Sequence, residues 1–237
     1  MIKVDGLSKR FGEVIALRDI SLELLPGTVT AIHGPSGSGK TTLLRLIAGL
    51  EAPTTGTIHI GGVLASTPSA VTAPHHRGVG FVFQEAALWP HMTVYQNVAF
   101  GLLGLPRGEV KARVAEMLAQ LDMDDLARRY PGELSGGQAR RVSLARTLVT
   151  DPPRLLLDEP LTHIHPEMRS EILKLIAQLA ADRGTTVVYV THELAEVARL
   201  GGSLIRMEEG AIVRSEACLA GEVSASDTPN RESFGAD

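Results

Sequence analysis

The sequence has only one cysteine and no long apolar run, and each shortage excludes a class of protein. Cys218, alone among 237 residues, has no partner for an internal disulfide, which is compatible with a reducing compartment. No stretch approaches the roughly 18 consecutive apolar residues that a membrane-spanning helix requires. The first residues also lack the apolar core of a signal peptide. We therefore expect a chain that is soluble by itself and reaches a membrane only through a partner.

Positive charge is not in excess either. Lysine and arginine number 23 against 27 aspartates and glutamates, so the formal net charge at pH 7 is −4. A dedicated nucleic-acid binder derives its affinity from clustered cations that neutralise phosphates, so we expect no nucleic-acid partner.

A length of 237 residues is enough to bury a full α/β core, as one domain or two closely joined subdomains.

Hydrophobic periodicity divides the chain into regions. Residues 2–33 are rich in strand signals and lead into a glycine-rich loop, which is followed by a helix with an apolar face. The middle is helical, with an apolar stripe over 110–121 and a second helix opened by Ser135. From Arg154 onward strands alternate with crossover helices, which predicts a parallel sheet covered on both faces. Residues 215–237 have little periodicity and are expected to form a flexible C-terminal tail.

The glycine-rich loop matches the phosphate-binding pattern G-x-x-x-x-G-K-T and lies between a predicted strand and a predicted helix. Its glycines allow the backbone to approach phosphate oxygens, and N–H groups at a helix start favour an anion. Lys40 is predicted to bridge the β- and γ-phosphates, and the Thr41 hydroxyl to bind Mg²⁺. A turn that matches by chance is the alternative. The predicted nucleotide-binding residues of this loop are Gly34, Pro35, Ser36, Gly37, Ser38, Gly39, Lys40, Thr41 and Thr42.

Polar side chains follow three other predicted strands. The apolar strand 155–157 leads into Asp158 and Glu159, of which the first is expected in the Mg²⁺ shell. Glu159 is expected to polarise the attacking water. His192 ends another apolar strand, at the sheet edge where ligands of parallel sheets bind. That place favours contact with a γ-phosphate over the structural role of most such histidines. Gln84 also follows a short strand, but taken alone it carries no functional signal.

A second glycine pair opens a helix well away from the first loop, in the segment Leu134-Ser135-Gly136-Gly137-Gln138. Such a pair at a helix start indicates a second phosphate-reading surface. A site shared between two copies of the chain needs two such surfaces, whereas a single site does not. We therefore expect a dimer with shared nucleotide sites, formed by two copies or by this chain and a similar one.

These motifs, in this order, resemble the ATP-binding subunit of an ATP-binding cassette (ABC) transporter over about residues 2–214. The resemblance implies an α/β fold: a P-loop NTPase core with a parallel sheet, an N-terminal antiparallel β-subdomain and an α-helical signature subdomain. It also implies one nucleotide-binding domain over residues 1–214. The core of that domain is expected at about 1–84 and 151–214, and the helical subdomain at about 85–150.

The resemblance also implies roles for single residues. Phe11 is similar to the aromatic residue that stacks on adenine. Gln84 is similar to the glutamine that senses Mg²⁺ and couples to the membrane partner. Glu159 and His192 resemble the catalytic glutamate and the switch histidine. The signature-like residues, implied to contact nucleotide held by the opposite subunit, are Ser135, Gly136, Gly137 and Gln138. The implied Mg²⁺-binding residues are Thr41, Gln84 and Asp158.

The implied function is ATP hydrolysis that powers solute transport by a membrane permease, with ATP and Mg²⁺ as cofactors. The segment 83–101 most resembles importers, which implies permease subunits as partners and a place at the cytoplasmic face of the membrane. An extracytoplasmic solute-binding protein is a further implied partner. Apolar residues in 88–94 are expected to form an exposed contact site for the permease, with burial in the helical subdomain as the alternative. The sequence does not identify the transported solute, because selectivity for the solute lies in the permease and any binding protein.

One departure from the family pattern follows Pro160. The family carries Ser-x-Leu-Asp there, whereas this chain has Thr162-His163-Ile164-His165. The histidine in place of aspartate predicts slow hydrolysis at ordinary ATP affinity, or else a variant whose neighbours have adjusted. A degenerate cassette with weak hydrolysis is therefore an alternative.

Two further alternatives are a non-transport ABC ATPase and a GTP-dependent switch. The first predicts tandem cassettes, a coiled-coil insertion or basic patches, and the second an Asn-Lys-x-Asp segment. The sequence contains none of these features.

Overall fold

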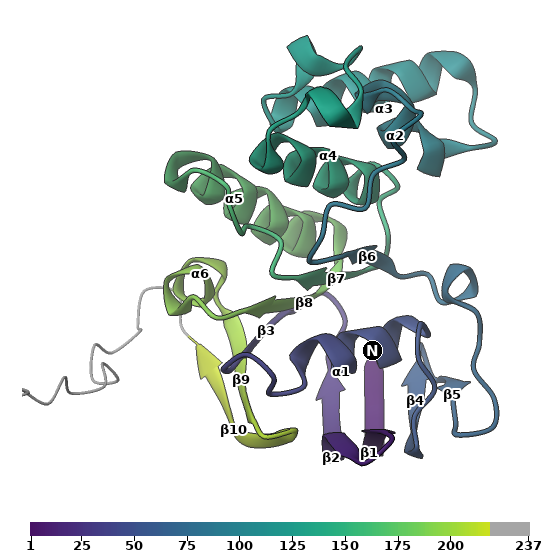
Figure 1. The fold of residues 1–237 in the computed structure, drawn as a ribbon, viewed down its shortest axis with the longest axis vertical. Coiled ribbons are helices and arrows are strands. Elements are labelled where there is room, and N and C mark those ends of the chain that lie inside the picture. Colours follow the sequence, from purple (N-terminus) through teal and green to yellow (C-terminus); the bar gives the residue numbers. More distant parts are fainter. Residues whose placement is uncertain (219–237) are drawn as a thin grey trace, which may run out of the picture.

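The computed structural model describes residues 1–218 and contains two β-sheets with one helix between them (Figure 1). The first sheet is antiparallel, with strand order β2-β1-β4-β5. Its strands are β1 (Ile2–Phe11), β2 (Val14–Leu24), β4 (Thr55–Ile60) and β5 (Val63–Ser66). The buried Ile2 of β1 lies opposite Leu24 of β2 and Ile60 of β4, so one apolar face of this sheet is directed into the core.

The second sheet has the strand order β10-β9-β3-β8-β7-β6, in which all pairs are parallel except the antiparallel pair β10–β9. Its strands are β3 (Val29–His33), β6 (Gly80–Val82), β7 (Arg154–Asp158), β8 (Thr186–Thr191), β9 (Gly202–Glu208) and β10 (Ala211–Cys218). β7 and β8 consist almost entirely of buried residues, as strands covered on both faces do. The predicted parallel sheet is confirmed.

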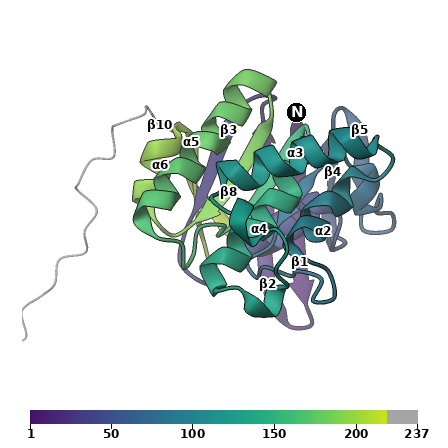
Figure 2. The ribbon, with the colours of Figure 1, turned by 90° about the horizontal axis from the view of Figure 1, so that it is seen from above.

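Helices cover both faces of the six-stranded sheet. α1 (Lys40–Ala48) lies between the two sheets, and α5 (Pro166–Arg183) lies on the opposite face (Figure 1). α6 (Leu194–Leu200) packs on β3 and β8. α2 (Val94–Ala99), α3 (Arg107–Gln120) and α4 (Gly136–Leu148) form a helical layer above the sheets (Figure 2).

Short 3₁₀ helices lie in the connections: η1 (Pro74–His76), η2 (Phe100–Leu102), η3 (Asp124–Leu126) and η4 (Pro131–Glu133). Within residues 1–218, no helix combines the length and apolarity needed to cross a bilayer. The arrangement confirms the predicted α/β fold with an antiparallel β-subdomain and a helical region.

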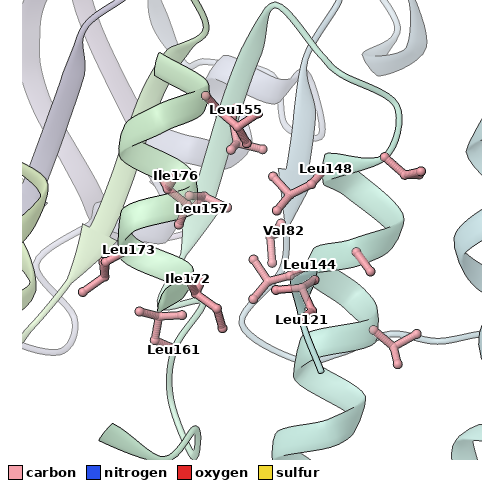
Figure 3. Packing of buried hydrophobic residues seen from close by; sticks show 14 of the residues in the cluster. Val82, Leu121, Leu144, Leu148, Leu155, Leu157, Leu161, Ile172, Leu173 and Ile176 are labelled. Atoms are coloured by element: carbon pink, nitrogen blue, oxygen red, sulfur yellow. The ribbon is translucent and has the colours of Figure 1, made fainter. Parts of the chain in front are cut away.

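Two large apolar clusters hold these layers together. In the first, Leu43, Leu44 and Ile47 of α1 pack against side chains from both sheets. In the second, side chains of α4 and α5 pack side by side on β6 and β7, on the face opposite α1 (Figure 3). Leu144 of α4 and Ile176 of α5 are fully buried in that cluster. The helical layer is thus fastened to the core sheet by continuous apolar packing.

The C-terminal boundary differs from the prediction. Ser215–Cys218 were expected in a flexible tail, but they continue β10 and pair with β9, where Ser215 lies opposite Ile205 and Cys218 opposite Gly202. That expectation was wrong for these four residues, because the polar run Arg214-Ser215-Glu216 interrupts the hydrophobic alternation of this edge strand. The remainder of the predicted tail, 219–237, lies outside the described residues.

The apolar residues of 88–94 do not form the exposed cluster that was expected. Val94 is fully buried at the start of α2, and Leu88 packs against the core cluster. Trp89 is half-buried, with its ring 4.2 Å from that of Phe100 and the Arg146 guanidinium 4.6 Å above it. These residues therefore pack into the helical layer. The sequence did not predict this burial, because α2 is too short for its hydrophobic pattern to show which of its faces is buried.

Candidate functional site

The glycine-rich loop joins β3 to α1, as predicted, and glycine is required where the helix begins. Gly39 is the N-cap of α1 and has a φ of 98°, in the left-handed region that favours glycine. A Cβ atom at this position would lie 2.6 Å from the carbonyl oxygen of Ala16 in β2. The loop is therefore wedged against the antiparallel sheet, and its shape is set by the fold on both sides.

Lys40 is the first residue of α1, and its side chain folds back over the loop. The Nζ atom donates to the carbonyl oxygens of Gly34, at 2.8 Å, and Pro35, at 2.7 Å. Burial lowers the pKa of Lys40, and the negative charges of Glu159 and Asp158 oppose that shift. A cation is thus held at the mouth of the loop, where an anionic ligand would replace its two carbonyl partners.

Thr41 and Asp158 bring a hydroxyl and a carboxylate together from two elements far apart in the sequence. Thr41 Oγ1 donates to Asp158 Oδ1 over 3.0 Å. Asp158 is 2% exposed, and this burial raises its pKa, against the hydrogen bond from Thr41, which lowers it. A buried carboxylate gains stability from a nearby cation, and hydroxyl and carboxylate oxygens are the ligands that Mg²⁺ prefers. The donor set at this position fits the predicted Mg²⁺.

Glu159 and His192 face each other at the ends of β7 and β8. Glu159 Oε2 lies 3.4 Å from His192 Nδ1, and the Glu159 side chain is 18% exposed. Glu159 also has a φ of 46°, which is uncommon for a residue other than glycine. Its backbone N–H donates to the carbonyl oxygen of Val190 over 3.0 Å, which holds this strained conformation in place.

Gln84 lies at the same edge of the sheet as these carboxylates. β6 and β7 are parallel, with Val82 opposite Leu157, and Gln84 and Glu159 each follow that pair by two residues. The Gln84 side chain is exposed. The structure therefore places Gln84 beside the strand end that carries Asp158 and Glu159.

Phe11 ends β1, at the turn that leads into β2, and pairs with Val14. Its ring is 46% exposed, and the Lys9 Nζ atom lies 4.7 Å from the ring centroid. An exposed ring with a cation over one face is able to stack on a planar aromatic ligand.

The signature-like segment begins α4 with a reciprocal cap. Ser135 Oγ accepts a hydrogen bond from the Gln138 N–H at 3.2 Å, and Gln138 Oε1 accepts one from the Ser135 N–H at 2.8 Å. Ser135 and Gly136 are exposed. A Cβ atom on Gly137 would lie 2.8 Å from the carbonyl oxygen of His163, so this position requires glycine.

Close packing at Gly137 sets the start of α4 directly against the loop 162–165. A hollow of about 420 Å³ opens between that loop and Ser135. α4 and α1 lie on opposite faces of the six-stranded sheet (Figure 1). The two glycine-rich helix starts are therefore separate surfaces of the molecule.

Two residues at the site were missed by the sequence reasoning. His33 ends β3, and its Nε2 atom lies 3.3 Å from the carbonyl oxygen of His192. Burial is the largest cause that lowers the pKa of His33, with Arg206 and Lys40 adding to it. The only signal in the sequence was its place directly before Gly34.

Arg140 is the second missed residue. It lies one turn into α4, is 7% exposed, and donates from Nη1 to the carbonyl oxygen of Phe83 over 3.0 Å. Burial lowers the pKa of Arg140, whereas Glu159, Asp158 and Glu85 raise it. Arg140 thus ties the signature-like helix to the residue before Gln84. A charged residue on a helix is usually solvated, so the sequence carried no signal for this contact.

Known proteins resemble this chain over most of its length. It is 44% identical to the sulfate/thiosulfate import ATP-binding protein CysA of Escherichia coli, over 91% of this chain and 60% of that protein. It is 45% identical to the Fe(3+) ions import ATP-binding protein FbpC of Pseudomonas fluorescens, over 92% of this chain and 62% of that protein. The chain spans about 60% of the length of these curated relatives.

Solved structures are similar as well. A dimeric ATP-binding cassette in a post-hydrolysis state, bound to ADP and Pi, has a TM-score of 0.85 and 33% identity, with 92% of this chain and 98% of that chain covered. CbiO1 from Clostridium perfringens, part of an ABC transporter complex, has a TM-score of 0.78 and 30% identity, with 91% and 88% covered. The family model described as ABC transporter matches residues 17–162. Because this match spans more than half of the sequence, the chain belongs to the ABC transporter family.

Proposed function

We propose that this protein binds ATP with Mg²⁺ and hydrolyses ATP to drive a membrane transporter. One observation carries the proposal: Lys40, the Thr41–Asp158 pair and the Glu159–His192 pair surround the end of the same parallel sheet. Ligands of open parallel sheets bind at the carboxyl ends of the strands. The family and the solved cassette with ADP and Pi support the same nucleotide.

Each residue of this edge has a proposed part in the reaction. The loop 34–42 and Lys40 hold the phosphates, and the exposed Phe11 ring stacks on the base. Thr41, Asp158 and Gln84 would hold Mg²⁺, which neutralises charge on the phosphates when it is bound.

Glu159 and His192 act on the water and the γ-phosphate. The Glu159 carboxylate accepts a hydrogen bond from the water and orients it. His192, 3.4 Å from that carboxylate, donates toward the γ-phosphate. The strained φ of Glu159 supports this role, because such conformations cluster at functional sites.

We propose that two cassettes share two nucleotides across their interface. Ser135, Gly136, Gly137 and Gln138 then contact the nucleotide held by the opposite cassette. The exposed start of α4 and its separation from α1 within one chain support this arrangement. The similar cassette with ADP and Pi is described as dimeric. The partner cassette is a second copy or a similar chain.

We further propose a membrane permease as the partner that is driven, which places the protein at the cytoplasmic face of the membrane. Relatives named as import ATP-binding proteins support an importer, with an extracytoplasmic solute-binding protein as a further component. Residues 85–150 are proposed to act as one helical subdomain against the core formed by 1–84 and 151–214. Arg140, which bonds to Phe83 at their junction, supports this division.

Phosphate release from ATP tests the proposal directly. The purified protein is expected to release phosphate when ATP and Mg²⁺ are present, and to stop when EDTA removes the cation, because the cation that Asp158 is proposed to hold neutralises charge on the phosphates. Replacing ATP by AMP provides the control for contaminating phosphatases. Phosphate release that persists in EDTA, or none at saturating MgATP, would contradict hydrolysis by this site.

His165 decides between an active and a degenerate cassette. It is exposed and occupies the N-cap of α5 without a side-chain capping bond. A carboxylate is favoured at the start of a helix, and a histidine there is larger and supplies no such group. His165→Asp is expected to raise the turnover number several-fold. Steady-state rates at saturating ATP measure this, and an unchanged turnover number would mean that the neighbours of His165 have adjusted.

A further inference from the structure

One arginine joins the loop after Glu159 to the segment after His192. Arg169 lies on the first turn of α5, and its Nε atom donates to the carbonyl oxygen of Ile164 over 2.8 Å. Its Nη1 atom lies 3.5 Å from Glu193 Oε1 and 3.9 Å from Glu196 Oε1. A single guanidinium therefore connects the loop 162–165 with the start of α6.

Glu196 is the buried end of this connection. Its side chain is 9% exposed, and its Oε2 atom accepts hydrogen bonds from Thr191 Oγ1 at 2.6 Å and from the Tyr189 hydroxyl at 2.9 Å. Thr191 Oγ1 also accepts from the Glu193 N–H at 3.0 Å. Because Thr191 directly precedes His192, the Glu196 carboxylate fixes the end of β8 from which His192 projects.

The charges in this network depend on one another. A buried carboxylate is costly unless a cation and hydrogen bonds compensate it, and removal of one partner leaves the other uncompensated. Arg169 supplies the cation for Glu196, and the two hydroxyls supply the hydrogen bonds. Burial, followed by the charge of Glu196, raises the pKa of Tyr189 well above its usual value, so Tyr189 remains a donor.

A small cavity is shared by this network and the Glu159–His192 pair. It has a volume of about 30 Å³, and Glu159, His192, Arg169 and Glu196 all line it. That volume is enough for one water molecule. A shift of the network would therefore change the space next to Glu159.

We propose that Arg169 and Glu196 are positioning residues for the reaction. Together they set the loop 162–165 against the end of β8 and thereby hold Glu159 and His192 at their mutual distance. The inference rests on the proposed ATP hydrolysis, but the two residues act through the protein fold rather than at the nucleotide. Misplacement by about 1 Å is enough to lower a rate on the order of a hundredfold.

Kinetics and hydrogen exchange of three variants test the inference. Arg169→Met removes the guanidinium but keeps an apolar stem, and Glu196→Gln keeps the acceptor for Thr191 and Tyr189. The matched control is Lys174→Met on the same helix, where Lys174 pairs with Glu171 at 2.9 Å in an exposed position. We expect kcat to fall roughly 10- to 100-fold in the first two variants, with KM for ATP within about twofold of the parent. The control variant is expected to match the parent.

Hydrogen exchange without nucleotide supplies the independent readout. Amides of 162–165 and 191–193 are expected to exchange faster in Arg169→Met and Glu196→Gln, while those of β7 and α1 stay as in the parent. The double variant is expected to lose little more rate than the worse single variant, because the two residues act as a unit.

Two results would overturn the inference. One is a parent-like kcat together with parent-like exchange in 162–165 and 191–193. The other is a uniform rise in exchange throughout the core, which indicates a merely structural role. If Arg169→Met does not fold, Glu196→Gln decides alone. A parent protein without ATPase activity would refute the proposed function, and the exchange experiment would still decide whether this network holds the two loops.

Discussion

Glu159→Gln is expected to lower the rate of ATP hydrolysis by about 100-fold or more while leaving nucleotide binding intact. The amide keeps the shape of the side chain and its place 3.4 Å from His192, but it is no longer a base toward water. Binding is retained because the phosphate loop, Lys40 and Thr41 are unchanged. Phosphate release and an ATP titration on the same preparation measure the two properties separately. Glu171→Gln, an exposed carboxylate on α5, is the matched control and should hydrolyse ATP at the parent rate.

The same variant is expected to accumulate as a dimer with trapped ATP. Slow hydrolysis leaves the shared sites occupied, so light scattering at saturating ATP should report about twice the mass of one chain, as the proposed two-site interface requires. Addition of Ser135→Arg places a large charged side chain at the exposed start of α4 and should return the protein to a monomer that still binds ATP. Only monomer in Glu159→Gln at saturating ATP would argue against shared sites.

Lys40→Ala is expected to weaken ATP binding by about 100-fold, which corresponds to about 3 kcal/mol for a charge-assisted contact. The variant removes the cation that faces the phosphates. It should fold normally, because burial already disfavours the charged lysine in the free protein, as its lowered pKa indicates. Isothermal titration measures the affinity, and the thermal midpoint without ligand checks the fold.

Lys111→Ala provides the comparison, since Lys111 is an exposed lysine on α3. It should bind ATP as the parent does. If Lys40→Ala bound ATP as tightly as Lys111→Ala, the nucleotide would lie elsewhere. The assignment of loop 34–42 as the phosphate-binding loop would then be wrong.

The parts of the fold that the sequence predicted are those with local signals. The apolar face of α1, the N-cap at Ser135 and the buried strand before Asp158 each lie within one short stretch, and each is found as expected. β10 was predicted too short, since Arg214, Ser215 and Glu216 interrupt its apolar pattern. Val94 was placed at the surface, although the capping box of Thr93 and Gln96 marks the start of a helix there.

The contacts that the sequence did not reveal join segments far apart in the chain. Arg140 reaches Phe83, 57 residues away, and Arg169 reaches Glu193, 24 residues away. Neither arginine has a neighbour in the sequence that distinguishes it from a solvated helix residue. His33 differs only by its position before the loop. Such residues become visible when the sheet topology brings the strand ends together.

The burial of α1 has a consequence for how the molecule comes apart. Leu43, Leu44 and Ile47 pack against both sheets. Unfolding of either sheet would therefore remove part of the apolar packing of α1. The first turn of the same helix is also where nucleotide is proposed to bind. Occupancy of that turn would therefore stiffen both halves of the molecule at once, and local opening near the phosphates would cost nearly as much free energy as global unfolding. Each bound nucleotide would then stabilise both sheets of the cassette together.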